Sequence, residues 1–244
     1  MIINRLSALI RRQDWSSLTI EMIVLVLGIF AGLQVNNWNE DRLEAKRLDR
    51  QLVSLAEEMK ENLKRLDAYQ DQLTGIIEDM ERFRRLFLEN PGEVSADELD
   101  RMLWRSIPIP TYQAKRFVLD AVLTSENFSA RQVGQLAGLL QAWDELQRRL
   151  ARVDQDALVY RDEHIHGIYT RRIAFSSIER YMEPPAQGLP ASPFGNRPEE
   201  ILADRVIENI ATVRLTMTLG NLEYVEDLRD KTAEIVAFIE NPPR

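Results

Sequence analysis

The chain has no cysteine among its 244 residues, which excludes disulfides, thiolate metal sites and cysteine nucleophiles. Basic residues are the minority of the charged ones, 31 Lys and Arg against 39 Asp and Glu, which gives a net charge of −8. No basic stripe is present to neutralise phosphates, so we expect no nucleic-acid partner. The average composition, 45% hydrophobic and 29% charged, is that of an ordinary acidic soluble protein.

Strand signals are also absent, and the few prolines are clustered. Alternating β-branched residues bounded by two-residue turns do not occur, and glycine is scarce at ten residues. Because proline breaks helix interiors, the proline-free blocks 1–90, 111–183 and 199–241 are each free to be mostly helical. The sequence predicts an all-α fold.

Residues 16–38 stand apart as an apolar segment with a single formal charge, Glu21. The eighteen residues 18–35 reach roughly 27 Å as a helix, close to the thickness of the hydrocarbon layer. Trp15 and Trp38 flank the segment where interfacial aromatic residues belong. We predict one uncleaved transmembrane helix over 16–38, with a cleaved signal peptide or a buried core helix as the alternatives.

The flanks of the span set the expected topology. Residues 1–15 read as a short amphipathic tail with three arginines, and four basic residues follow the span within 42–50, so the charges nearly balance. We expect the arrangement of an uncleaved signal anchor, with the tail in the cytoplasm and residues 39–244 forming one helical domain on the other side.

One face of the span is a candidate contact surface. Glu21, Leu25, Gly28 and Gly32 follow spacings of four, three and four, which places them on one stripe of a helix. Two glycines four apart let backbones approach closely, and an ionisable group inside a membrane normally faces a partner or water. The stripe favours association with a second copy or with another membrane protein. The alternative is that the glycines simply face lipid and that Glu21 lies near enough to the membrane surface to reach water.

The stretch Glu21 to Glu40 resembles the N-terminal hallmark of a family of uncharacterised bacterial single-span membrane proteins, in which a Leu-Gln-x-Asn-Asn-Trp-Asn-Glu motif ends the span. The resemblance is looser further on, where Ser125-Glu126 replaces the family's Ser-Gly pair. It implies single-pass topology in the bacterial cytoplasmic (inner) membrane and a periplasmic domain, and it supplies no catalytic residues. Together with Trp15, the residues at the membrane interface are Gln34, Asn36, Asn37, Trp38, Asn39 and Glu40.

A sustained heptad pattern follows the span. From Leu48 to Phe87 the apolar positions alternate by four and three, with only Asn62 polar in the seam. We expect the transmembrane helix to continue as a long stalk helix to about residue 90. The seam packs either on later helices of the same chain, which we favour, or on a second copy as a coiled coil whose register Asn62 sets.

Four further helices are expected. A capping box at Ser95 and Glu98 opens a short helix that stops before Pro108, and a second short helix covers about 114–124. A capping box at Ser129 opens a long helix to about 182, antiparallel to the stalk, and a last helix covers 199–240. The segment 183–198 would then return to the membrane side, with Leu189 and Phe194 at the headgroups. The predicted fold is an antiparallel bundle of three long helices, with the two short helices at its distal end.

The sequence offers little chemistry. His164 and His166 lie two apart on a predicted helix and point in different directions, so they cannot chelate a metal together. We expect acidic pairs such as Glu57-Glu58 and Glu199-Glu200 to be solvated faces rather than paired catalytic carboxylates, and no nucleotide-binding or hydrolase motif occurs. We expect no enzyme activity, cofactor or metal. We expect a membrane-anchored protein that contacts lipid and acts through protein contacts as a scaffold or accessory subunit, or alternatively an extracytoplasmic sensor module.

Overall fold

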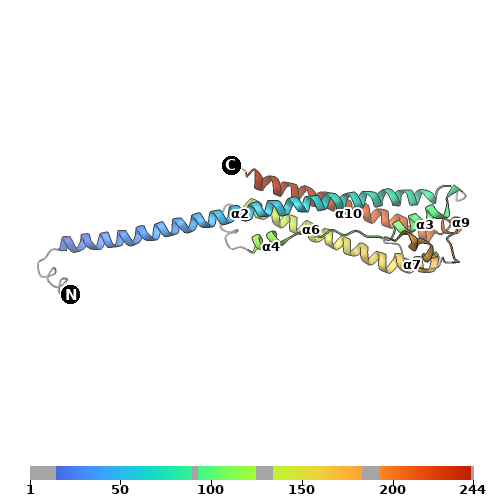
Figure 1. Cartoon of the computed structure of the whole chain (residues 1–244), viewed down its shortest axis with the longest axis horizontal. Coiled ribbons are helices and arrows are strands. Elements are labelled where there is room, and N and C mark those ends of the chain that lie inside the picture. Colours follow the sequence, from blue (N-terminus) through green and yellow to red (C-terminus); the bar gives the residue numbers. More distant parts are fainter. Residues whose placement is uncertain (1–14, 90–92, 125–133, 183–192, 243–244) are drawn as a thin grey trace. The chain divides into compact units, whose positions relative to one another are not determined.

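A computed structural model describes residues 15–89, 93–124, 134–182 and 193–242. Within these ranges the protein is all-α and contains no strand, which confirms the predicted class (Figure 1). A π-helical turn, η2 (Arg161–Ile165), and a 3-10 turn, η3 (Glu179–Tyr181), join some of the helices. The helices are α2 (Trp15–Leu86), α3 (Ala96–Arg105), α4 (Phe117–Leu123), α6 (Gly134–Tyr160), α7 (His166–Arg172), α8 (Phe175–Ile178), α9 (Pro198–Ile201) and α10 (Arg205–Glu240).

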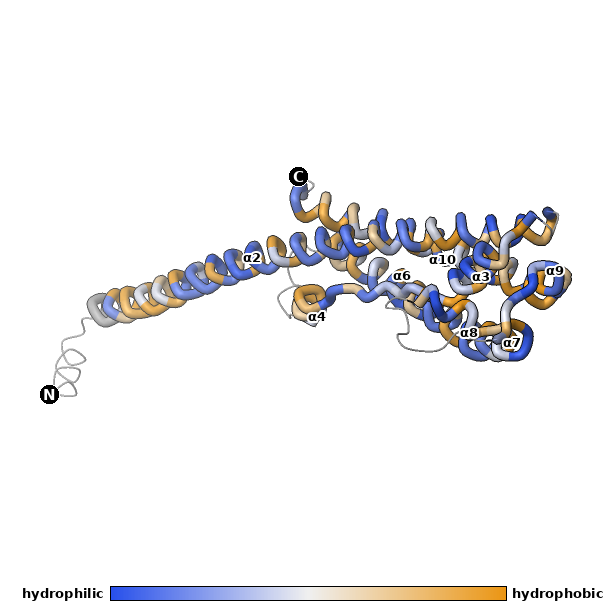
Figure 2. The backbone as a smooth tube through the Cα atoms, turned by 45° about the vertical axis from the view of Figure 1, so that its right-hand side comes forward, coloured by the Kyte–Doolittle hydropathy of each residue, from blue (hydrophilic) through white to orange (hydrophobic). Residues whose placement is uncertain are grey.

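The chain divides into two compact units, Met1–Leu52 and Val53–Arg244, and helix α2 contributes to both without a break. In the first unit, α2 carries a run that is long and apolar enough to cross a membrane, and none of that run is buried. Figure 2 shows this run as the predominantly hydrophobic first part of the helix.

In the second unit, α6 and α10 pack lengthwise against each other, and α2 runs beside them so that the three helices share an apolar seam (Figure 1). The heptad positions of α2 supply one side of this seam, and Asn62 in the same seam is also buried. The intramolecular interpretation of the heptad therefore holds for this unit. The fully buried apolar members from α2 are Leu55, Met59, Leu66, Leu73, Met80 and Phe83.

Contacts with α2 show which way each segment runs. Helix α3 lies beside the later part of α2, where Arg105 Nη1 contacts the Asp79 carboxylate at 2.6 and 2.7 Å. Helix α4 begins beside the earlier part, where Glu58 accepts hydrogen bonds from the N–H groups of Val118 and Leu119 at 2.8 and 2.9 Å. The two short helices thus lie at opposite ends of the bundle, and the expectation of both at the distal end was wrong for α4.

Between α3 and α4 the chain returns along the bundle as an extended segment, residues 107–116, which we call the strap. Because the strap makes the return, α6 runs in the same direction as α2. Its Gln147 accepts a hydrogen bond from Arg116 near the start of α4, and its Asp154 meets Tyr69 further along α2. The prediction that the helix after residue 129 runs antiparallel to the stalk was wrong. Helix α10 is the antiparallel one, ending where Glu240 meets Lys60 at 2.8 Å.

The helix expected to reach residue 182 ends earlier. Helix α6 passes through the π-helical turn η2 into α7, and Ile173 then adopts an extended conformation with φ −127° and ψ 160°. A π turn inserts an extra residue and rotates the buried face, so the three-four pattern no longer follows one stripe. No proline or glycine marks the break at Ile173, and the sequence therefore gave no signal for it.

The ends of other helices follow the expected chemistry. Ser95 Oγ accepts the N–H of Glu98 at 3.1 Å, as a helix N-cap requires. The last helix begins at Arg205 rather than 199, because Asp204 caps it by accepting the N–H of Val206 at 2.8 Å. The expected tail at 1–15, apart from Trp15, and the capping box at Ser129 lie outside the described residues, as does Leu189.

Residues 193–197, the described part of the segment before α9, do not lie at the start of the bundle. Asn196 is buried, donates from Nδ2 to Asp100 Oδ1 in α3 at 2.7 Å, and accepts the N–H of Ala174 at 2.7 Å. Since α3 lies beside the later part of α2, Phe194 lies at that end of the second unit. The expectation that Phe194 sits at the end nearer the span was wrong.

Candidate functional site

The predicted contact stripe of the span is exposed. Glu21, Leu25, Gly28 and Gly32 all have exposed positions on α2. A Cβ atom added at Gly28 or Gly32 would meet no heavy atom within 4 Å. Within the described residues this face is therefore open to lipid or to another protein.

The motif at the end of the span forms contacts within its own helix. Asn36 Nδ2 donates to Glu40 Oε1 at 2.8 Å, and the Arg42 guanidinium lies 6.0 Å from the centroid of the Trp38 ring. Gln34, Asn37 and Asn39 are exposed. Trp15 is the first residue of α2, and its side chain lies outside the described residues. These contacts make a polar and aromatic collar directly after the apolar run, as expected of a helix leaving a bilayer.

Asn62 has a specific partner inside the second unit. Its side chain is fully buried, donating from Nδ2 to the carbonyl of Lys115 and accepting the N–H of Lys115 through Oδ1, both at 2.8 Å. The amide thus satisfies both backbone groups of one strap residue. In this structure Asn62 fixes the strap rather than a neighbouring helix.

Other helix side chains hold the rest of the strap in the same way. An extended segment without a neighbouring strand must satisfy its N–H and C=O groups elsewhere, and here α2, α6 and α10 provide partners. Tyr69 OH lies 3.3 Å from the carbonyl of Pro110, and Arg65 Nη1 lies 3.4 Å from that of Gln113. The strap is therefore anchored by all three long helices.

Asp154 of α6 is the centre of this buried network. Its carboxylate accepts hydrogen bonds from Tyr69 OH at 2.5 Å, from the N–H of Tyr112 at 3.0 Å and from Asn221 Nδ2 at 3.3 Å. Burial raises the pKa of Asp154 above its ordinary value, opposed by the hydrogen bonds from Tyr69 and Tyr112. Burial likewise raises the pKa of Tyr69, and the neighbouring Asp154 carboxylate adds to the effect.

Arg214 of α10 anchors the start of the strap. It is 2% exposed, and it donates from Nε to the carbonyl of Ser106 at 3.1 Å and from Nη2 to that of Pro108 at 3.0 Å. Burial lowers the pKa of Arg214 to about 10. Ser106 and Tyr169 share a further hydrogen bond of 2.6 Å between their hydroxyl groups. The strap thus leaves α3 at a buried polar junction of α3, α7 and α10.

A second buried carboxylate, Asp100 of α3, organises the far end of the bundle. Besides Asn196, it accepts hydrogen bonds from Ser177 Oγ at 2.9 Å and from Arg180 Nη2 at 3.2 Å. No histidine lies among the partners of either buried carboxylate that the structure describes. Both carboxylates therefore act as anchors for backbone and side-chain donors.

The two histidines do not come together as a metal site. His164 lies on the π turn beside the Tyr160 ring, with 5.0 Å between centroids, whereas His166 Nδ1 lies 3.5 Å from the Asp162 carboxylate. Within the described ranges, no three His, Asp or Glu side chains lie close enough to hold a metal ion. The acidic residue Glu58, expected to be a solvated face, is instead a buried helix cap.

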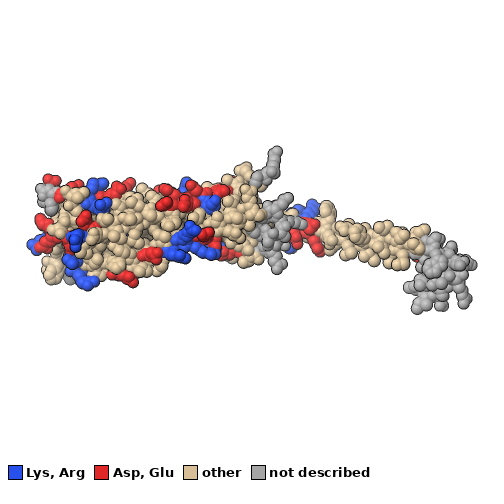
Figure 3. Space-filling view, turned by 180° about the vertical axis from the view of Figure 1, so that it is seen from behind, with Lys and Arg blue, Asp and Glu red and all other residues tan. Residues whose placement is uncertain are grey.

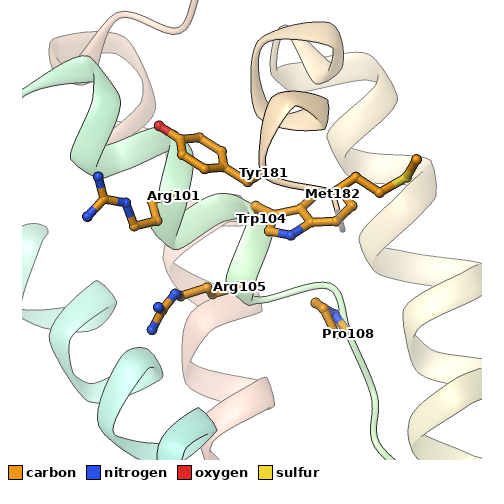
Figure 4. Close-up of a pocket in the computed structure, with 6 residues that line it drawn as sticks. All are labelled: Arg101, Trp104, Arg105, Pro108, Tyr181 and Met182. Atoms are coloured by element: carbon orange, nitrogen blue, oxygen red, sulfur yellow. The ribbon is translucent and has the colours of Figure 1, made fainter. Parts of the chain in front are cut away.

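Two surface cavities lie beside the strap. One, of about 440 Å³, lies between the strap and the face of α2 around Gly75. The other, of about 420 Å³, is a bowl over α3 and the 3-10 turn, which we call the α3 bowl (Figure 4). Pro108 lines both cavities. The residues around the α3 bowl are Arg101, Trp104, Arg105, Pro108, Tyr181 and Met182.

Sequence patterns alone did not locate the strap anchors. Asn62 was visible as a polar residue in an apolar seam, and the two prolines marked a non-helical segment. Asp154 was missed because the three-four pattern runs through its neighbour Val153, although Asp154 is the more buried of the two. The only signal for Asp154 in the sequence was an acidic residue one position away from the apolar stripe.

Comparison of the chain with protein-family models, with curated proteins and with solved structures gives no match.

Proposed function

We propose that this protein is a single-span membrane-anchored helical protein of the bacterial inner membrane that acts by protein contacts, as a scaffold or accessory subunit. The tail lies in the cytoplasm and the helical domain in the periplasm. The observation that carries the proposal is the apolar run of α2, whose large side chains from Ile20 to Val35 are between 52% and 66% exposed. A run of this kind is stable only when lipid or another protein covers it.

The second unit supports a role in binding rather than catalysis. Its two most buried carboxylates, Asp100 and Asp154, are each engaged by donors from the chain, and its surface mixes charges of both signs on the face seen in Figure 3. A reacting carboxylate needs access to a substrate. The domain instead offers a long outer surface over packed helices.

Association through the contact stripe is part of the proposal. Leu25 lies on the stripe with Gly28 and Gly32, whereas Phe30 lies on the opposite side of the same helix. Because the chain has no cysteine, Leu25→Cys and Phe30→Cys each introduce a unique thiol. In membranes under mild oxidation, Leu25→Cys should form a disulfide-linked dimer and Phe30→Cys should not.

If the partner is another membrane protein rather than a second copy of this chain, the expected result is copurification instead of a disulfide-linked dimer. After gentle solubilisation, the wild-type chain should then copurify with one other protein in a fixed ratio, and the Gly28→Leu, Gly32→Leu double variant should lose it. The Phe30→Leu variant is the matched control and should keep the partner. A monomeric chain with no copurifying protein and no Leu25→Cys dimer would overturn the proposal.

A second candidate is an extracytoplasmic sensor or ligand-binding module that signals through a partner. The α3 bowl favours it, because a concave surface lined by aromatic, apolar and guanidinium groups is typical of a ligand site. Saturable binding of a small molecule that changes association of the span would support this function over a fixed scaffold.

A further inference from the structure

The α3 bowl has an unusual balance of hydrogen-bonding groups. Arg101, Trp104 and Arg105 come from one exposed face of α3, at spacings of three and four, and Tyr181 and Met182 close the rim (Figure 4). Four of these side chains carry N–H or O–H donors, Tyr181 among them, and none is a carboxylate. A ligand that fits the bowl must therefore provide acceptors.

The two arginines are held in place but not saturated. Arg105 contacts Asp79 through Nη1, and Arg101 contacts Asp97 through Nη2 at 2.8 Å. Each guanidinium has further N–H groups on Nε and the other Nη, and these donate to no acceptor among the described residues. The carboxylates thus orient the arginines and leave donors for a ligand.

The remaining lining is aromatic and apolar. Tyr181 donates its hydroxyl to Asp97 Oδ1 at 2.6 Å, and its ring lies 5.9 Å from the Arg101 guanidinium carbon. The Trp104 indole N–H has no acceptor among the described residues, and Pro108 and Met182 add apolar surface. A volume of about 420 Å³ is within the range of small-molecule sites.

We propose that the α3 bowl binds a small carboxylate with an aromatic or apolar body. The carboxylate accepts hydrogen bonds from the guanidinium groups of Arg101 and Arg105, and the body lies against Trp104, Pro108 and Met182. Charge-assisted hydrogen bonds from guanidinium to carboxylate are stronger than neutral ones and set the orientation of the ligand. This site does not depend on association of the span.

Fluorine NMR of the full chain labelled with fluorotryptophan tests the proposal, with phenylacetate as the probe. The four tryptophans report four places: Trp104 in the bowl, Trp143 buried in the bundle, and Trp15 and Trp38 beside the span. Phenylacetate should shift the Trp104 resonance saturably and leave Trp143 unchanged. Shifts at Trp15 and Trp38 alone would show that the probe only enters the detergent, and would overturn the proposal.

Two further probes, one without the charge and one without the ring, measure the contributions of the carboxylate and of the aromatic body separately. Phenylethanol keeps the ring and lacks the charge, so its affinity should be about tenfold lower, the loss expected for a charge-assisted hydrogen bond. Acetate keeps the charge and lacks the ring, and it should give no saturable shift. Equal affinities for phenylacetate and phenylethanol would contradict the role of the arginines.

Arg105→Gln should lower the affinity for phenylacetate about tenfold, because it removes the guanidinium donors. The matched control is Arg82→Gln: Arg82 pairs with Glu98 of α3 but does not line the bowl, and this variant should bind as the wild type does. An unchanged Trp143 resonance shows that each variant is folded. If Arg105→Gln perturbs Trp143, Arg101→Gln replaces it. Wild-type affinity in a folded arginine variant would overturn the proposal.

Discussion

Asp154 and Arg214 are both buried, yet no ion pair joins them among the described residues. Asp154 accepts the N–H of Tyr112, and Arg214 donates to the carbonyls of Ser106 and Pro108. A buried charge is costly unless its hydrogen bonds are satisfied, and here the partners are mostly backbone groups that need partners themselves. Each charged side chain therefore stabilises the strap directly.

Replacing Asp154 by alanine should lower the free energy of unfolding by about 2–3 kcal/mol, because the Tyr112 N–H and Asn221 Nδ2 lose their acceptor inside the bundle. Asp154→Asn should cost less, since its amide oxygen can still accept the Tyr112 N–H. Urea unfolding followed by circular dichroism measures both. Asp156→Ala, at an exposed position of the same helix, is the control, and an equal loss there would contradict this role of Asp154.

The raised pKa of Asp154 predicts the sign of a pH effect. The folded state holds the proton more tightly than the unfolded chain, whose carboxyl has the ordinary pKa near 3.8. The stability of the wild type relative to Asp154→Asn should therefore fall as pH rises from 3.8 through the folded-state pKa, and stay constant above it. A difference that grows with pH in this window would contradict the burial of this carboxylate.

Asn62 separates the two interpretations of the heptad. Asn62→Leu completes the apolar seam, so in an intermolecular coiled coil it would strengthen association or change the number of chains. In the structure it leaves the N–H and carbonyl of Lys115 without partners, which should cost about 1–3 kcal/mol. Unfolding and sedimentation measurements on the full chain distinguish the two interpretations. For Asn62→Leu we expect lower stability and no change in association. Higher stability would favour the coiled coil.

At the scale of elements, the helices with a regular apolar period were predictable and the strap was not. The seam of α2 from Leu55 to Phe83 repeats every three and four residues, and the structure buries it. The strap has no period, because its stability comes from side chains that lie far away in the sequence, such as Asp154 and Arg214. Propensity and periodicity are local signals and do not report such pairings.

The direction of α6 also depends on contacts between residues that are far apart in the sequence. A proline-containing segment between two helices is equally compatible with a tight turn and with a long return path. The strap takes the return path because Asn62, Asp154 and Arg214 offer partners along it. The sequence therefore predicted the class and the main helices, while the order of their directions required the three-dimensional contacts.

Helix α4 is capped from another element. Its own N-cap residue, Arg116, makes no side-chain cap, and Glu58 of α2 instead accepts the N–H groups of Val118 and Leu119, the second and third residues of the helix. Glu58→Gln should speed amide exchange at Val118 and Leu119 and cost about 1 kcal/mol, since a carboxylate at a helix N-terminus also interacts with the helix dipole. Hydrogen exchange measures this. The neighbouring exposed residue provides the control Glu57→Gln, and faster exchange in that variant would contradict the assignment.

At the scale of the whole molecule, the charged residues are distributed unevenly along the chain. One formal charge, Glu21, occurs within 16–38, and the acidic excess belongs to the remaining helices. The average composition, which resembles that of a soluble protein, therefore conceals an apolar run in α2 of which no residue is buried. This contrast is the basis for the proposed anchor with a charged helical domain attached.

Single-cysteine accessibility in spheroplasts tests the anchor and its orientation most directly, since the wild-type chain supplies no background thiol. With a membrane-impermeant maleimide, we predict that Asp230→Cys is labelled at once and that Ser7→Cys is labelled only after the membrane is opened. Phe30→Cys should stay unlabelled until detergent is added. Labelling of Phe30→Cys in intact membranes, or of Ser7→Cys and Asp230→Cys from the same side, would contradict the account.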